Sequence, residues 1–291
     1  MQLTLEGSAL GLRDYWLDFT NNAKLQPRLG QFKLPFNREF LTSTSALQFV
    51  DRSIVNEEFQ LGRDVGVALR GYLGGDKFEY GIGAFNGSAK NRTNRDRALM
   101  YVGRATLNLL GKPSYSQADL DYSEKSTLAV GAAFAFLPNF KPVLEGADDR
   151  ANLARAVIAA GEDTSDVKQL TLDAFFKSKG FSFEGEYHVR SIGRQEVRTV
   201  FTRGNRVANG LRLQAGYFIM PKKFEIALRF AKVDLDSNTG NDVTREITPA
   251  FSYYISGHRL KLQADASFFT QQAPGDDLHD RRARTQVQFF F

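Results

Sequence analysis

The chain has 291 residues, a formal net charge of +5, 25 phenylalanines and no cysteine. The lack of cysteine excludes a disulfide framework and thiolate metal sites. No run of about 18 apolar residues is present, which excludes a membrane-spanning helix, and the opening residues MQLTLEGS have no signal-peptide pattern.

Alternating apolar and polar residues predict β-strands along the chain, because successive side chains of a strand point to opposite faces. The predicted strands cover 1–7, 11–19, 24–34, 64–73, 77–86, 98–110, 126–137, 167–178, 181–192, 209–219, 223–234, 244–255, 258–269 and 283–291. These are about 14 strands, and several have about 10 to 12 residues, the length that crosses a bilayer at a tilt. Strands of soluble sandwiches usually have about five or six residues.

The predicted connections alternate in length. Short ones lie at 21–23, 74–76, 179–180, 221–222 and 256–257, and long ones at 35–63, 87–97, 138–166, 193–208, 235–243 and 270–282. Short turns on one rim and long loops on the other are typical of bacterial outer-membrane barrels. The connection at 111–125 is long where this alternation predicts a short turn.

The two faces of each strand differ sharply. In FSFEGEYHVRS, for example, the apolar face carries Phe181, Phe183, Tyr187 and Val189, and the polar face carries Ser182, Glu184, Glu186, His188 and Arg190. The polar faces are too charged for a packed core, and the apolar faces are too continuous to lie in water. The pattern therefore favours a barrel with a lipid-facing outside and an aqueous lumen over a soluble sandwich.

The polar faces supply the residues predicted to line the lumen. The basic ones are Arg70, Lys77, Arg104, Lys177, Arg190, Arg212, Arg229, Arg259 and Lys261. The acidic ones are Asp14, Asp18, Asp64, Glu79, Asp173, Glu184, Glu186, Glu225, Glu246 and Asp265. Because the two signs nearly balance, any ion selectivity has to come from the loops.

One helix is predicted inside the 138–166 connection. Leu153, Ala156, Val157 and Ala160 form an apolar stripe, Asp148 or Asp149 is placed to cap the start, and Gly161 suits the end. We expect this helix to pack over the barrel mouth or at a subunit contact.

Five short motifs carry a family resemblance. They are LRDYWLDF at 12–19, GQFKLPF at 30–36, LQFVDRS at 47–53, GRDVGV at 62–67 and FNG at 85–87. In this order and spacing they resemble the phosphate-selective porin O and P family of Gram-negative outer membranes. The C-terminal TQVQFFF, with Val287, Phe289 and Phe291 on one face, also resembles the last strand by which outer-membrane barrels are recognised for assembly.

The resemblance implies an all-β fold, a transmembrane antiparallel β-barrel occupying residues 1–291 as a single domain. It implies about 16 strands in intact members, a homotrimer, and a location in the outer membrane of a Gram-negative bacterium in contact with lipid and lipopolysaccharide. Members usually begin with a further periplasmic segment and strand, for which this chain shows no counterpart.

The resemblance also makes residues 35–63 the constriction loop, which folds inward and narrows the pore. The basic residues at or near its motif positions are Lys33, Arg38, Arg52 and Arg63. Arginine suits a phosphate path because its planar fork matches phosphate oxygens. An alternative role for Arg52 and Arg63 is structural, because acidic neighbours could pair with them and pin the loop: Asp51, Glu57, Glu58 and Asp64.

A second basic series follows the 181–192 strand and comprises Arg190, Arg194, Arg198, Arg203 and Arg206. It is interpreted as an arginine ladder that guides anions, since clefts lined by one sign concentrate counter-ions. The alternative is an exposed loop that contacts lipopolysaccharide phosphates, which is also the interpretation for KNRTNRDR at 90–97.

The function predicted from these features is passive diffusion of small anions through an outer-membrane porin, with phosphate or polyphosphate as the candidate solute. The alternatives are a general porin with little ion selectivity and a structural barrel of an envelope assembly. An enzyme built on His188, Glu186 and Ser182 is a weaker alternative. The sequence predicts no cofactor, no metal site and no nucleic-acid partner.

Overall fold

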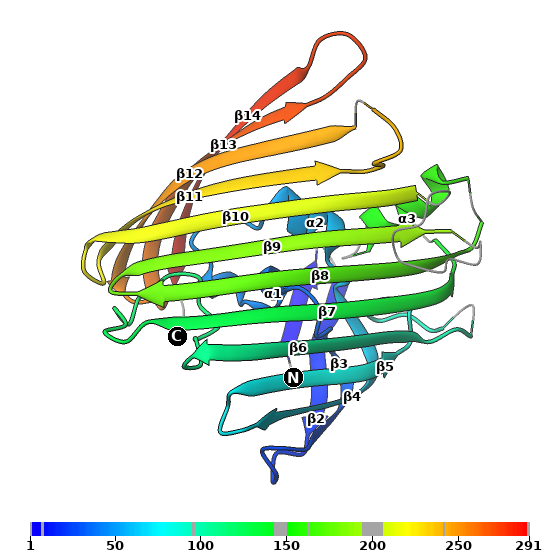
Figure 1. Ribbon diagram of the computed structural model, residues 1–291, viewed down its shortest axis with the longest axis horizontal. Helices are drawn as coiled ribbons and strands as arrows, with labels where there is room; N and C mark the ends of the chain where they lie inside the picture. The colour runs from blue at the N-terminus through cyan, green and yellow to red at the C-terminus, as the bar shows by residue number, and fades with distance from the viewer. Residues whose placement is uncertain are drawn as a thin grey trace.

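A computed structural model describes residues 2–6, 9–94, 97–142, 150–161, 163–193, 206–240 and 242–289. The described strands form one antiparallel sheet in the order β1 to β14, each paired with the next in sequence (Figure 1). The first seven are β1 (Gln2–Glu6), β2 (Ala9–Asp18), β3 (Gln26–Lys33), β4 (Arg63–Leu73), β5 (Phe78–Phe85), β6 (Met100–Leu110) and β7 (Thr127–Phe140). The others are β8 (Ser165–Ser178), β9 (Phe181–Ile192), β10 (Arg206–Met220), β11 (Phe224–Asp234), β12 (Val243–Ser256), β13 (Leu260–Gln271) and β14 (Leu278–Phe289).

The helices all lie in connections between strands. They are α1 (Arg38–Leu41), the 3-10 helix η1 (Thr44–Ala46), α2 (Ile54–Phe59) and α3 (Ala151–Ala159). Among the described residues, none of these helices is long and apolar enough to cross a membrane.

The sheet curves strongly but does not close. β1 and β14 stand at the two ends of the strand order, and the described residues show no pairing between them. The closed barrel expected from the sequence is therefore an open, curved sheet here. Both edge strands leave a row of backbone groups without a strand partner within the described residues, which a closed barrel would not do.

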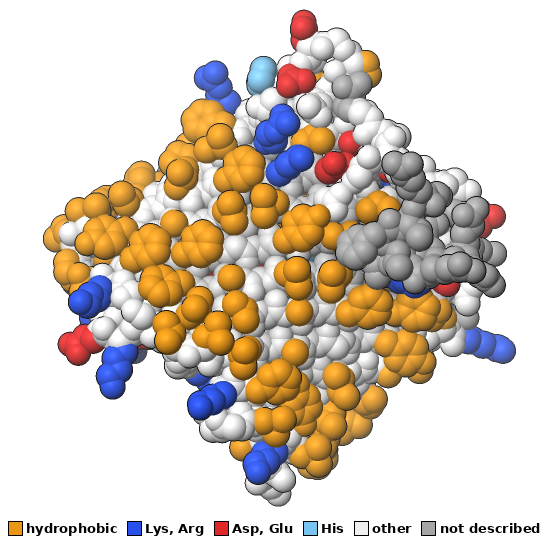
Figure 2. All heavy atoms as spheres, in the orientation of Figure 1, with side chains coloured by type: hydrophobic (Ala, Val, Ile, Leu, Met, Phe, Trp, Pro, Cys, Tyr) orange, Lys and Arg blue, Asp and Glu red, His pale blue; other side chains and the backbone are white. Residues whose placement is uncertain are grey.

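The apolar face of the sheet points outward. Ile82, Leu228 and Phe251 are each more than half exposed, whereas the inward Arg212 and Lys261 are fully buried. Figure 2 shows this outer surface as a broad apolar field, with charged side chains gathered toward its margins. The inside-out pattern predicted for a lipid-facing barrel is confirmed.

Two predicted lumen residues are corrected by the structure. Lys77 and Arg259 lie in the short turns that precede β5 and β13, and both are exposed to solvent. The turn before β5 places Gly74, Gly75 and Asp76 at φ values of 62°, 64° and 70°. This left-handed conformation suits glycine, which is why the strand alternation breaks there and Lys77 leaves the lumen face.

Helix α3 packs at the loop rim of the sheet. Its predicted stripe is buried at Leu153, Ala156 and Val157 and packs into a core cluster with residues of β3, β6 and β8. The predicted aspartate cap is wrong: Arg150 occupies the N-cap position, and Asp148 and Asp149 lie outside the described residues. Of the two expected locations, the structure supports the barrel mouth.

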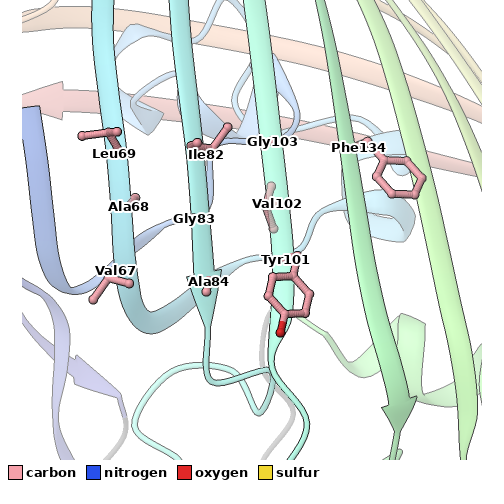
Figure 3. A pocket seen from close by; sticks show the side chains of 10 residues that line it. All are labelled: Val67, Ala68, Leu69, Ile82, Gly83, Ala84, Tyr101, Val102, Gly103 and Phe134. Atoms are coloured by element: carbon pink, nitrogen blue, oxygen red, sulfur yellow. The ribbon is translucent and has the colours of Figure 1, made fainter. Parts of the chain in front are cut away.

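The outer face of β4 to β7 carries a hollow of about 630 Å³ (Figure 3). Strand pairing sets Leu69, Ile82, Gly103 and Phe134 in one row across it. Because Gly103 has no side chain, the row is interrupted between Ile82 and Phe134. The hollow lies on the apolar outside and is separate from the lumen.

Candidate functional site

The constriction loop (35–63) folds into the concave side of the sheet, and strands distant in sequence hold its backbone. The Val50 N–H donates to Asp265 Oδ2 at 2.9 Å, and the Ile54 N–H donates to Glu246 Oε2 at 2.9 Å. Lys261 Nζ donates to the carbonyl of Leu47 at 2.8 Å. In Figure 1, α1 and α2 are seen behind the front strands, on the inside of the curve.

Gln48 is the centre of this attachment. Its side-chain amide donates to Ser182 Oγ at 2.8 Å and to Glu225 Oε1 at 2.6 Å, and its side-chain oxygen accepts from Gln214 Nε2 at 2.9 Å. All four residues are buried. Buried polar groups are costly to leave without hydrogen-bond partners, so the network fixes the loop against β9 to β11.

Two acidic residues of the loop, Glu39 and Glu58, are paired with the C-terminal wall, the name used here for β8 to β14. Glu39 lies 3.3 Å from Arg212, whose guanidinium also lies 2.9 Å from Glu184 and 3.8 Å from Glu186. Glu58 forms an ion pair with Arg190. The loop is net acidic in sequence, but these charges are neutralised on the side away from the open lumen.

Arg38 belongs to the same buried layer. It is 2% exposed, lies 3.6 Å from Glu184, and its guanidinium stacks 4.0 Å from the centre of the Phe175 ring. It lines neither of the lumen cavities described next. These contacts hold Arg38 against the C-terminal wall.

Two neighbouring cavities lie on the other side of the loop, against the N-terminal wall formed by β2 to β5. They measure about 320 and 290 Å³, and both are bordered by Arg28, Phe32, Lys33 and Leu41. The basic residues lining one or both are Arg13, Arg28, Lys33, Arg63, Arg70 and Arg104. The acidic residues that line them are Asp14 and Glu79. The open side of the lumen is therefore predominantly basic.

Three of the predicted basic residues meet around one aromatic ring. Lys33 Nζ, Arg52 and Arg63 lie 5.1, 5.2 and 5.6 Å from the centre of the Phe40 ring. Lys33 Nζ donates to the carbonyl of Phe40 at 2.6 Å, and Arg52 Nη2 donates to the carbonyl of Thr42 at 2.9 Å. Burial lowers the pKa of Arg52 below its usual value.

The other arginines of the N-terminal wall are paired, with one exception. Arg63 Nε lies 3.0 Å from Asp14, and Asp18 pairs with Arg28 at 2.6 Å and with Arg70 at 2.8 Å. Arg13 makes no ion pair or side-chain hydrogen bond with another residue in the described part of the chain. Among the described residues it is therefore a positive charge in the lumen that no carboxylate pairs with.

Sequence reasoning missed Arg13 because strict alternation places it opposite Asp14. The pairing of β1 with β2 shifts register between Gln2 and Leu3, which face Asp14 and Leu12. This β-bulge at Arg13 allows adjacent residues to line the same cavity. No sequence signal reveals the bulge, whereas Arg28 could have been found, since it lies on the polar face of β3.

The predicted arginine ladder is only partly within the described residues. Arg194, Arg198 and Arg203 lie outside them. Arg190 is 1% exposed and also donates to the carbonyl of Glu58 at 2.9 Å, so it holds the constriction loop. Arg206 Nε donates to the carbonyl of Leu235 at 3.2 Å.

The proposed enzymatic group is sealed from solvent. His188 is fully buried, lies 3.4 Å from Glu186 and stacks on Phe59 at a ring separation of 5.2 Å. Ser182 is hydrogen-bonded to Gln48. This arrangement gives no substrate access to a nucleophile and base, and no metal-binding cluster occurs among the residues that the structure describes.

Comparison with solved structures places the fold among outer-membrane channels. The chain superposes on Acinetobacter baumannii DcaP with a TM-score of 0.55, 12% identity, and coverage of 91% of this chain and 71% of that one. It superposes on Pseudomonas putida OprB with a TM-score of 0.54, 10% identity, and coverage of 90% and 69%. It superposes on the trimer form of OmpT of Vibrio cholerae with a TM-score of 0.53 and 9% identity, and the match covers 96% of this chain and 78% of that one. At these identities the likeness shows a shared fold.

Sequence comparison identifies the family. An uncharacterized protein of Aquifex aeolicus (strain VF5) is 25% identical over 299 residues, which cover 95% of this chain and 67% of that protein. The family model described as phosphate-selective porin O and P matches residues 2–291. This chain is therefore a member of the phosphate-selective porin O and P family and a porin of the Gram-negative outer membrane.

Proposed function

We propose that this porin passes small anions by passive diffusion, and that the path runs between the constriction loop and the N-terminal wall. The observation that carries the proposal is the charge of the two cavities there, which are lined by six basic and two acidic side chains. A cleft lined mainly by one sign concentrates ions of the other sign.

Phosphate is the candidate solute. Lys33, Arg52 and Arg63 gather around Phe40. Lys33 and Arg63 line the same cavity as Arg13, whereas Arg52 lines neither cavity and lies against the Phe40 ring. Charge-assisted N–H donors can replace the water that a phosphate loses on entry. Chloride makes fewer such bonds, so phosphate should dwell longer and block chloride current.

The test is a salt-gradient measurement in a planar bilayer. We expect a reversal potential that shows chloride passing more readily than potassium, and a chloride current that falls as phosphate is added. Arg13→Gln should move the reversal potential toward zero, because it removes the unpaired charge. Arg259→Gln is the matched control, because Arg259 lies in an exposed turn.

A cation-selective reversal potential in the unmodified protein would overturn the anion proposal. A reversal potential near zero would leave a general porin, and a folded protein without conductance would favour a structural barrel. Trp16 lines the cavity that holds Arg13 and is the single tryptophan, so its fluorescence gives a second readout of phosphate binding.

The assembled protein is proposed to be a closed barrel of about 16 strands, with further strands pairing the free edges of β1 and β14. Support comes from the coverage of the solved channels, of which this chain spans 69 to 78%. Closure would give the edge backbone groups partners, which lipid cannot supply.

A homotrimer is proposed as the assembly, with the hollow at Gly103 as part of the subunit contact. The hollow is apolar, lies on the outer face and belongs to the N-terminal half of the chain. OmpT of Vibrio cholerae, which shares the fold, is described as a trimer. The basic segment 90–97 is proposed to face lipopolysaccharide phosphates at the loop rim.

A further inference from the structure

The connection between β6 and β7, residues 111–126, is far longer than is needed to join two adjacent strands. It lies at the rim where 179–180, 221–223 and 257–259 join neighbouring strands by short turns (left in Figure 1). Two residues suffice to join adjacent antiparallel strands. The extra length therefore serves something other than connection, and this segment is called the strap below.

The strap folds into the lumen. Ala118 and Asp119 are fully buried. The Asp119 carboxylate accepts from the Ser123 hydroxyl at 2.6 Å and from the Gly180 N–H at 2.7 Å, which ties the strap to the turn between β8 and β9. A side chain at position 180 would collide with the Tyr122 ring, since a Cβ there would lie 2.5 Å from it.

The strap reaches across to the far side of the sheet. Lys177 Nζ of β8 donates to Ser114 Oγ at 3.0 Å, and Ser116 Oγ lies 2.9 Å from Nε2 of His258, in the turn between β12 and β13. Ala118 packs in a core cluster with Phe218 and Tyr254. These contacts span β8, β10 and β12, so the strap covers the turn-rim end of the C-terminal wall.

The strap also supports the constriction loop from the turn rim. The Gln117 N–H donates to the carbonyl of Ala46 at 3.0 Å, and its side-chain oxygen accepts from the Gln48 N–H at 3.0 Å. Loop and strap thus form two connected layers across the same half of the lumen. What they leave open lies beside the N-terminal wall, in the cavity of about 320 Å³.

Tyr115 is the strap residue that borders this cavity. Its hydroxyl donates to Glu79 Oε1 at 3.2 Å, and the guanidinium of Arg38 lies 4.9 Å from the centre of its ring. Burial raises the pKa of Tyr115, so the hydroxyl stays protonated and available as a donor. The ring is therefore held at its hydroxyl by Glu79 and over its face by Arg38, at the edge of the opening.

We propose that the strap is a second constriction of the pore at its turn-rim end, and that the Tyr115 ring sets the largest solute that can pass. The inference rests on the proposed function only in assuming a water-filled path. It concerns solute size, whereas the anion proposal concerns the sign of the charge, so the two can fail separately.

The test compares Tyr115→Ala, Tyr115→Phe and Tyr115→Trp by single-channel conductance and by swelling of liposomes in neutral sugars. Alanine should raise conductance about twofold and admit larger sugars, because conductance follows the open cross-section. Phenylalanine should match the parent protein and tryptophan should lower both values. Unchanged sugar uptake and conductance in folded alanine and tryptophan variants would overturn the proposal.

A chemical test avoids relying on substitutions alone. The chain has no cysteine, so Tyr115→Cys and the control Glu124→Cys each carry one thiol. Glu124 lies on the same strap, is exposed and lines neither lumen cavity. A bulky methanethiosulfonate reagent should reduce current in Tyr115→Cys and leave Glu124→Cys unchanged. Equal responses of the two labelled proteins would contradict a constriction at Tyr115.

Discussion

Arg63 Nε lies 3.0 Å from both carboxylate oxygens of Asp14, at the start of β4 and in β2 respectively, and both side chains are almost fully buried. The pair stands on the wall of the basic cavity, opposite the constriction loop. Under the proposed function, Arg63 both stabilises the wall and contributes charge to the anion path, and Asp14 determines how much of that charge an ion meets.

Neutralising Asp14 and neutralising Arg63 should move the ion selectivity of the pore in opposite directions. Asp14→Asn removes the carboxylate that lies 3.0 Å from Arg63 and should strengthen the preference for chloride, whereas Arg63→Gln removes the guanidinium that faces Asp14 and should weaken or reverse this preference. A change of about 1 kcal/mol in the energy of an ion at this position alters the permeability ratio about fivefold. The reversal potentials of the two single variants and of the double variant measure this change in selectivity. Shifts of the same sign in the two single variants would contradict a place for this pair on the ion path.

Arg52 should contribute to the block of chloride current by phosphate. Its guanidinium uses Nη2 and Nε on the carbonyls of Thr42 and Glu39, at 2.9 and 3.3 Å, which leaves further donors for an anion. Hydrogen bonds to charged groups contribute about 1.5–3 kcal/mol, so Arg52→Ala should weaken the block about tenfold. The exposed Arg281→Ala is the control, and an equal block in both variants would exclude Arg52 from the path.

The strands could be predicted from sequence because a lipid-facing sheet repeats the same alternation of apolar and polar residues in every strand. The predicted strand at 181–192 coincides with β9, and 223–234 differs from β11 by one residue. The positions of Lys77 and Arg13 could not be predicted, because a turn of left-handed residues and a β-bulge interrupt the alternation locally.

The candidate site was predictable in part. The resemblance indicated an inward loop, and the structure places Lys33, Arg52 and Arg63 together around Phe40. It could not indicate that Arg38 is buried against Phe175, nor that the strap lies inside the lumen. Those positions depend on contacts between residues far apart in the chain, such as Gln48 with Gln117, which leave no local pattern.

Arg212 should be essential for holding the constriction loop. It is fully buried among the carboxylates of Glu39, Glu184 and Glu186. Arg212→Met removes the cation that these three carboxylates share and leaves Glu184 only its longer contact of 3.6 Å with Arg38. Breaking a buried pair in this way costs about 3–5 kcal/mol. Denaturant unfolding in detergent, followed by the fluorescence of Trp16, should show that loss, together with faster proteolysis of the loop.

A second substitution separates charge from packing at Arg212. Adding Glu184→Gln to Arg212→Met removes one of the stranded charges and should recover part of the lost stability. If the double variant is no more stable than the single one, Arg212 acts through its bulk rather than through its charge.

Filling the hollow at Gly103 should impair subunit association. Gly103 faces outward between Ile82 and Phe134, so Gly103→Trp leaves the lumen unchanged and closes the hollow. The control Ala215→Trp also faces outward, on β10 beside the exposed Leu228. Gel migration without heating should show loss of the trimer band for Gly103→Trp alone. A trimer that survives this substitution would place the subunit contact elsewhere.

Conductance should rise at acid pH through the release of the strap. Burial, with smaller effects of Lys261 and Lys177, lowers the pKa of His258 from 6.5 to about 4. Folding therefore favours the neutral ring that contacts Ser116; this stabilisation is fully present above pH 6.5 and is lost as the pH falls toward 4. His258→Gln keeps a polar group and should remove this pH dependence. Single-channel recordings from pH 7 to about pH 4 provide the measurement, and a rise of the same size in His258→Gln would assign the effect to other groups.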